Sequence, residues 1–137
     1  KQVADFITDN GLSERVRFVG MSDDVVPLYA AADLVAFPAT SPHQARPVLE
    51  AGAMAKPVVV SDFANLREFV EDGVTGITAP PNDVGALARA IRRIVDSPAL
   101  AARLGEGNYA MAFAKHNRET NAPKLVAAYE RLARVRA

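Results

Sequence analysis

The chain has 137 residues, half of them hydrophobic, and its 16 basic and 16 acidic side chains give a formal net charge of zero. This balance gives no reason to expect nucleic acid as a partner, and the length suits a single domain. Cysteine is absent, which excludes disulfides and thiolate metal sites, fits a reducing compartment and leads us to expect a cytoplasmic protein.

The first predicted element is an amphipathic helix from Lys1 to Asn10, which Gly11 ends. Because the chain opens inside this helix and has no initiating methionine, we expect it to be a piece of a longer protein. Arg15 to Gly20, with the sequence RVRFVG, alternates in polarity and predicts a strand. Ser22 or Asp23 can then cap a helix that runs from Asp24 to Ala32.

Three further segments read as strands of a parallel sheet. Leu34 to Pro38 and Val58 to Val60 are continuously apolar, as is typical of strands buried on both faces, and Thr75 to Ala79 follows them. Helices are predicted between and after these strands, and their alternation with strands indicates an α/β fold with a doubly wound parallel sheet. Their predicted ranges are about Pro47 to Ala55, Asn65 to Glu71, Asp83 to Val95, Ala99 to Ala114 and Asn121 to Arg136.

The stretch from Ser41 to Asp62 is the best candidate for a site. Pro47 favours a helix start, because proline suits the first helical turn and the residue before it avoids helical geometry. The helix has almost no polar face, so we expect it to be nearly buried, with Glu50 as its one carboxylate. Glu50 has two possible roles. Its chemistry favours the first, in which it complements the helix dipole or pairs with a neighbouring arginine. In the second, it accepts hydrogen bonds from a ligand hydroxyl such as that of a ribose.

The residues PVLEAGAMAKPVVVSDFANLREFVEDGVTGITAPPNDVGALARAI resemble the C-terminal, donor-binding domain of GT-B glycosyltransferases, specifically the retaining group 1, family 4-like enzymes. The ordered matches extend the resemblance over most of the chain from Arg15 onward. They are Glu50, Ala51, Lys56, Pro57, Val58, Val59, Glu68, Asp72, Gly73, Thr75, Gly76, Pro80, Asp83 and Leu87.

The resemblance implies that residues 1–137 form part of a Rossmann-like nucleotide-sugar-binding domain, with terminal helices at 99–136. The donor would be a nucleotide-diphosphate sugar, without a cofactor or an obligatory metal. In the family, two strand–helix units that carry the cations for the diphosphate precede this region, as does an N-terminal acceptor-binding domain. We therefore expect that domain to be a partner of this chain, and any peripheral membrane association to occur through the part that is missing here. We also expect the isolated chain to be inactive and the strand from Arg15 to Gly20 to lack its neighbouring strands.

The resemblance also assigns site residues. The nucleotide base would lie against Gly20, Met21 and Ser22, although Ser22-Asp23 also suits an ordinary turn. Val48 and Leu49 would offer backbone N–H groups to phosphate, and Glu50 would accept from the ribose. Glu68 either orders the loop from Asp62 to Asn65 or forms a salt bridge.

The catalytic motif departs from the family pattern. Pro42 stands where the first glutamate usually lies, and His43, Gln44 and Ala45 replace the usual Gly-Phe-Gly. His43 is a candidate donor or general base, or else an exposed loop residue. Arg46 either binds phosphate or, as we favour, pairs with a surface acid.

No catalytic residue can be assigned from these positions, and Pro42 leaves three functions open. The first is sugar transfer to an acceptor hydroxyl in the complete enzyme. The second is a non-catalytic GT-B remnant that acts as a binding module, and the third, which the group 1 motifs disfavour, is a nucleotide-sugar epimerase.

Overall fold

The structure is a computed structural model that describes residues 2–135. Lys1 and Arg136, which the sequence assigns to the first and last helices, lie outside the described residues. The elements follow one another as α1 (Gln2–Asp9), α2 (Val26–Ala31), β1 (Val35–Phe37), α3 (Arg46–Ala53), β2 (Val58–Ser61), η1 (Ala64–Leu66), β3 (Gly76–Ala79), α4 (Val84–Val95), α5 (Pro98–His116) and α6 (Arg118–Val135).

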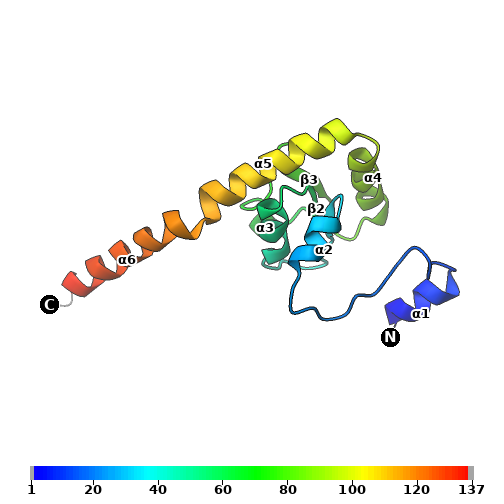
Figure 1. Ribbon diagram of the computed structural model, residues 1–137, viewed down its shortest axis with the longest axis horizontal. Coiled ribbons are helices and arrows are strands. Elements are labelled where there is room, and N and C mark those ends of the chain that lie inside the picture. Colours follow the sequence, from blue (N-terminus) through cyan, green and yellow to red (C-terminus); the bar gives the residue numbers. More distant parts are fainter. Residues whose placement is uncertain (1, 136–137) are drawn as a thin grey trace.

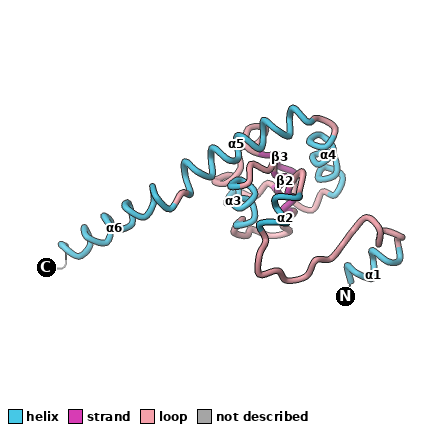
Figure 2. The backbone as a smooth tube through the Cα atoms, in the orientation of Figure 1, coloured by secondary structure: helices cyan, strands magenta, loops and turns pink. Residues whose placement is uncertain are grey.

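The three strands form a parallel sheet in the order β1-β2-β3, which confirms the predicted α/β class. Figures 1 and 2 show β2 and β3 surrounded by helices. β2 lies in the middle, and all four of its residues are buried. Alternate side chains of a strand point to opposite faces, so Val58 and Val60 pack with α3 while Val59 packs with α4 and α5. Helices therefore cover both faces of the sheet.

Close contact between α5 and the segment that joins α3 to β2 completes this core. A side chain at Gly105 would overlap the carbonyl oxygen of Ala55, so only glycine permits α5 to lie this close. The buried Asn108 of the same helix donates from Nδ2 to the Lys56 carbonyl at 2.9 Å. This bond satisfies both polar groups where the helix crosses the start of β2.

The helix starts in the C-terminal half follow their capping residues. The Asp83 carboxylate accepts from Ala86 N at 2.8 Å and begins α4 where the sequence predicts. Ser97 accepts from Leu100 N at 3.3 Å and begins α5 at Pro98. α5 runs two residues beyond the predicted end, and α6 begins at Arg118, three residues before the predicted start, with Pro123 inside it.

The predicted strand from Arg15 to Gly20 is wrong. Arg15 lies in a turn and residues 16–20 have no regular structure. A strand needs a hydrogen-bonded neighbour, and in the part of the chain that the structure describes none lies beside this segment. Its apolar side chains Val16, Phe18 and Val19 are consequently exposed.

Two elements are less buried than the sequence predicts, namely β1, for which it predicts burial on both faces, and α3, which it predicts to be nearly buried. β1 is an edge strand with a neighbour on one side, and its Ala36 is exposed. α3 buries Val48, Ala51 and Gly52 but leaves Ala53 in solvent, so it covers the sheet with one face. Sequence hydrophobicity overestimated the burial of both elements because alanine tolerates either environment.

The helix predicted from Asn65 to Glu71 is reduced to the single 3-10 turn η1, followed by a turn at residues 67–69. Asn65 does not cap it, because its Nδ2 donates to the His43 carbonyl at 2.8 Å. Neither Ser22 nor Asp23 caps α2, where the Asp24 carboxylate accepts from Val26 N at 3.0 Å. Short polar side chains suit several neighbouring cap positions, which is why their sequence signal is imprecise.

Two extensions leave the compact part of the molecule (Figure 1). The first consists of α1 and the linker of residues 10–25, and the second is α6, which projects from the end of α5 in the opposite direction. α6 exposes an apolar stripe that consists of Leu125, Val126, Tyr129 and Leu132.

Candidate functional site

The loop between β1 and α3 lies at the carboxyl edge of the sheet, where open α/β folds bind ligands. It ends at the buried Ala45, the N-cap of α3. Arg46 and Pro47 form the first turn, so the helix begins one residue before the predicted position. The predicted residues from His43 to Glu50 are thus brought together on one loop and the helix that follows it.

Glu50 is half-buried and is held by α2. The Tyr29 hydroxyl donates to Glu50 Oε2 at 2.8 Å, so the observed partner is a tyrosine rather than an arginine. Burial, together with the hydrogen bond to Glu50 and its negative charge, raises the pKa of Tyr29 to about 12. The Lys56 ammonium also donates to the carbonyl of the neighbouring Ala30 at 2.9 Å, which adds a second bond to the C-terminal half of α2.

Sequence reasoning missed Tyr29, because the two partners lie 21 residues apart and no local pattern links them. The hydrogen bond restricts the Glu50 carboxylate to one orientation. A carboxylate held in this way can accept further hydrogen bonds from hydroxyl groups of a ligand.

His43, Gln44 and Arg46 are exposed around the start of α3. The His43 Nδ1 donates to the Gln44 carbonyl at 2.8 Å, and its ring centroid lies 6.1 Å from that of Phe37. With the Asn65 bond to the His43 carbonyl, these contacts hold the loop against β1 and η1. Arg46 forms no ion pair with any of residues 2–135, so the favoured pairing with a surface acid is not found.

The backbone at Val48 is already engaged. Its N–H donates to the Ala45 carbonyl at 3.0 Å, and its side chain is fully buried. Leu49 is half-buried beside it. A phosphate that took the Val48 N–H would have to replace this turn of α3.

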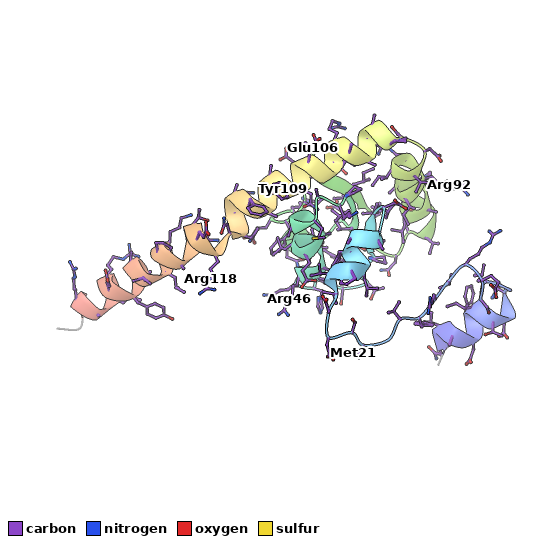
Figure 3. The ribbon with its side chains drawn as sticks, viewed as in Figure 1. Met21, Arg46, Arg92, Glu106, Tyr109 and Arg118 are labelled. Carbon is purple, nitrogen blue, oxygen red and sulfur yellow. The ribbon has the colours of Figure 1, made fainter. Side chains whose placement is uncertain are left out.

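Gly20, Met21 and Ser22 are exposed residues of the linker, and Figure 3 shows Met21 away from the compact part. The Ser22 hydroxyl donates to the Asp24 carbonyl at 2.6 Å, as expected of an ordinary turn. Within residues 2–135 no hydrogen bond joins this segment to residues 43–50. The structure therefore brings together the α3 part of the predicted site but not the linker part.

Glu68 is exposed and takes part in neither predicted interaction among the described residues. The neighbouring Arg67 pairs with Asp62 instead, with contacts of 2.9 and 3.1 Å. The hydrogen bond from Arg67, aided by its positive charge, lowers the pKa of Asp62 below its usual value. This pair orders the loop after β2, the role considered for Glu68.

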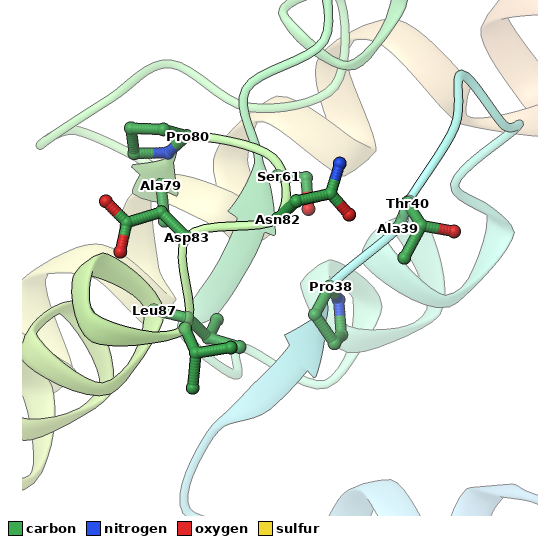
Figure 4. A pocket seen from close by; sticks show the side chains of 10 residues that line it. Pro38, Ala39, Thr40, Ser61, Ala79, Pro80, Asn82, Asp83 and Leu87 are labelled. Carbon is green, nitrogen blue, oxygen red and sulfur yellow. The ribbon is translucent and has the colours of Figure 1, made fainter.

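A depression lies at the same edge of the sheet and was not anticipated from the sequence (Figure 4). It has a volume of about 220 Å³ and occupies the carboxyl ends of all three strands and the start of α4. We call it the strand-end depression. Its lining residues are Pro38, Ala39, Thr40, Ser61, Ala79, Pro80, Asn82, Asp83, Val84 and Leu87.

Among residues 2–135, no three histidine, cysteine, aspartate or glutamate side chains are grouped so that they could hold a metal ion. No helix in the same range is both long enough and apolar enough to cross a membrane.

Comparison with known proteins identifies relatives of the chain. Residues 1–97 match the family model described as glycosyl transferases group 1. The alpha-D-kanosaminyltransferase of Streptomyces kanamyceticus is 30% identical over 124 residues, which are 89% of this chain and 32% of that protein. The glycogen synthase of Mycobacterium tuberculosis is 36% identical over 105 residues, 72% of this chain and 25% of that protein.

Solved structures agree with these sequence matches. Sucrose-phosphate synthase from Thermosynechococcus elongatus superposes with a TM-score of 0.92 at 31% identity, covering 98% of this chain and 34% of that one. Anabaena HepE, solved in complex with UDP-glucose, superposes with a TM-score of 0.89 at 30% identity. The match covers 94% of this chain and 36% of the HepE chain. The chain spans about a third of the length of these proteins.

Proposed function

Because this chain belongs to the group 1 glycosyl transferases, we propose that it forms part of the donor site of a retaining glycosyltransferase. The observation that carries the proposal is the Glu50 carboxylate, which Tyr29 orients at 2.8 Å on the helix after the first strand of the sheet. Anabaena HepE, which is 30% identical, is known in complex with UDP and with UDP-glucose, and this supports a nucleoside-diphosphate sugar as the ligand.

In this proposal each part of the ligand meets a suitable group. Glu50 accepts hydrogen bonds from the ribose hydroxyls, since its carboxylate has acceptor sites beyond the one that Tyr29 uses. The N-terminus of α3, at Val48 and Leu49, attracts the diphosphate through the partial positive charge of the helix dipole, while the Val48 N–H keeps its bond to the Ala45 carbonyl. The exposed guanidinium of Arg46 lies in the first turn and adds a full positive charge. Gly20 to Ser22 would contact the base once the linker is held in place.

We further propose that the complete protein transfers a sugar to an acceptor hydroxyl in the cytoplasm. An acceptor-binding domain outside this chain would be the partner across the cleft. The diphosphate would leave with help from α3 and from cations that this chain does not supply. Pro42 offers no carboxylate to the donor sugar, so we assign no catalytic residue, and His43 stays a candidate.

Calorimetry with UDP-, GDP- and ADP-sugars on the complete protein that contains this chain tests donor binding. Glu50→Gln is the informative variant, because its amide oxygen still accepts from Tyr29 while the negative charge is lost. We expect saturable binding of one donor class, weakened about tenfold by Glu50→Gln, as for the loss of a charged hydrogen-bond acceptor. Glu106→Gln, at an exposed glutamate of α5 without a side-chain hydrogen bond among the described residues, is the matched control and should bind normally.

Two outcomes would contradict the proposal. Failure of every nucleotide sugar to bind the complete protein would favour a non-catalytic binding module, the alternative that Pro42 raises. Measurable sugar transfer by the 137-residue chain alone would refute the claim that this part is inactive by itself.

A further inference from the structure

The strand-end depression has the position and the chemistry of a second binding site. All three strands of the sheet end on it, and α4 begins beside it (Figure 4). The carboxyl ends of parallel strands are where open α/β sheets place ligands. None of its lining residues belongs to the proposed nucleotide-sugar site at residues 43–50.

Ser61 supplies the observation that points to a ligand. It ends the strand VVVS, only 6% of its surface is exposed, and its side chain lines the depression. Its carbonyl accepts from Phe63 N at 2.9 Å, whereas its hydroxyl makes no hydrogen bond to any residue from 2 to 135. The hydroxyl is not sealed in the protein interior but opens on the depression, so a hydrogen-bonding ligand above the strand would take the place of solvent on it.

The other polar groups around Ser61 favour a neutral ligand that carries hydroxyls. Thr40 contributes a hydroxyl, and Asn82 contributes an amide from an exposed position in the loop before α4. Asp83 has one carboxylate oxygen bonded to Ala86 N, which leaves the second as an acceptor. The negative charge of Asp83 and the absence of lysine and arginine from the lining disfavour a phosphate or carboxylate here.

The apolar lining suits the non-polar face of a sugar ring. Pro38, Pro80 and Leu87 come from the ends of β1, β3 and the first turn of α4. The volume of about 220 Å³ is smaller than the roughly 300–1,000 Å³ of pockets that hold drug-sized ligands. The depression therefore has room for one ring but not for a nucleotide as well.

We propose that the strand-end depression binds a single neutral sugar ring, through the Ser61 hydroxyl and the Asn82 amide, independently of the nucleotide. This second sugar site goes beyond the donor site and does not depend on Glu50. In a sugar-transferring protein, such a ring would belong to a sugar other than the donor, for example one end of an acceptor whose remainder lies on the acceptor-binding domain. A ring that reached the depression only as part of a nucleotide sugar would belong to the donor.

NMR titration of the full 137-residue chain with methyl α-D-glucopyranoside, and separately with UDP, tests this proposal. We expect the glucoside to shift the amide signals of Ser61 and Asn82, and UDP to leave them unchanged. Ser61→Ala and Asn82→Gly should each raise the glucoside Kd about three- to tenfold, as expected when one hydrogen bond is lost. Glycine is chosen at Asn82 because the backbone there has φ 62°, which glycine adopts freely.

Ser13→Ala, at an exposed serine outside the depression, and Glu50→Gln should both leave glucoside binding unchanged. Unchanged melting temperatures would show that the two depression variants are folded. The proposal is overturned if the glucoside does not bind, or if it binds equally well to folded Ser61→Ala. The proposal is also overturned if the amide signal of Ser61 shifts only with UDP-glucose and no longer shifts in Glu50→Gln. That result would assign the depression to the sugar of the donor.

Discussion

Two segments of this chain have strand-like sequences, and only one of them is a strand. Val58 to Val60 have no exposed surface and pair with β1 and β3 on either side. Val16, Phe18 and Val19 are 43%, 63% and 57% exposed in a segment that pairs with nothing in residues 2–135. The comparison teaches that alternating or continuous apolar residues make a segment suitable for a sheet, whereas neighbouring strands decide whether it joins one.

The same contrast separates the helices. α5 packs against α3 and against the sheet through buried residues such as Leu104 and Asn108. α6 has a comparable length, but Leu125, Val126, Tyr129 and Leu132 are exposed. The core of this chain therefore consists of β1 to β3 with α3, α4 and α5, together with Leu66 of η1 and the nearby Val70, and the two extensions contribute little to it.

Leu104→Ala should have the largest effect on stability. Leu104 is fully buried between α5 and the sheet, and deleting such a side chain costs about 2–5 kcal/mol. Leu132→Ala, at a residue that is 60% exposed on α6, should change stability by about 0.5 kcal/mol or less. Urea unfolding of both variants measures the difference, and equal losses would contradict the division into core and extension.

Gly105→Ala should come next, with a loss of about 1–3 kcal/mol, because the new methyl group would press on the Ala55 carbonyl. Gly85→Ala is the control, since it lies at an exposed position of α4 and its nearest neighbour is the flexible end of Arg89. This control should gain about 0.5–1 kcal/mol from improved helix propensity. Thermal unfolding measures both changes in stability. If the two substitutions changed the melting temperature in the same direction, the close packing of α5 would be refuted.

The raised pKa of Tyr29 should make the stability of the folded chain depend on pH. Its pKa in the folded chain is about 12, above the usual value of 10, so its stabilising contribution is complete below about pH 10 and is lost as the pH rises through 12. Ultraviolet titration should show one tyrosine that ionises late, and Tyr29→Phe should remove that step. Glu50→Gln should lower this pKa by removing the adjacent charge. A late step that persisted in Tyr29→Phe would mean that another tyrosine is responsible.

The smallest effect should come from the exposed pair of Arg67 and Asp62. Arg67 lowers the pKa of Asp62, so the stabilisation is present above about pH 4 and is lost as the pH falls through the lowered value. Arg67→Gln should raise the Asp62 pKa in a carboxyl NMR titration while hardly affecting stability at pH 7. An unchanged Asp62 pKa would show that the pair does not form in solution.

Local sequence signals predicted much of this fold. The helix starts predicted at Asp83 and about Ala99 each lie within one residue of the observed starts, and the continuous valines located β2, because helical periodicity and complete burial leave direct marks in the sequence. The contacts that shape the site could not be predicted in this way. The Tyr29 bond to Glu50, the Asn65 bond to His43 and the clustering of Thr40, Ser61 and Asn82 all join residues distant in the chain.

Hydrogen exchange on the 137-residue chain, with and without UDP-glucose, tests the central claim that the three-stranded core folds as described and carries the nucleotide-sugar site. We predict strong protection of the amides of Val58 to Val60 without ligand, fast exchange at residues 16–20, and added protection at residues 45–50 with UDP-glucose. Equal protection of the two strand-like segments, or ligand protection confined to α6, would contradict the account.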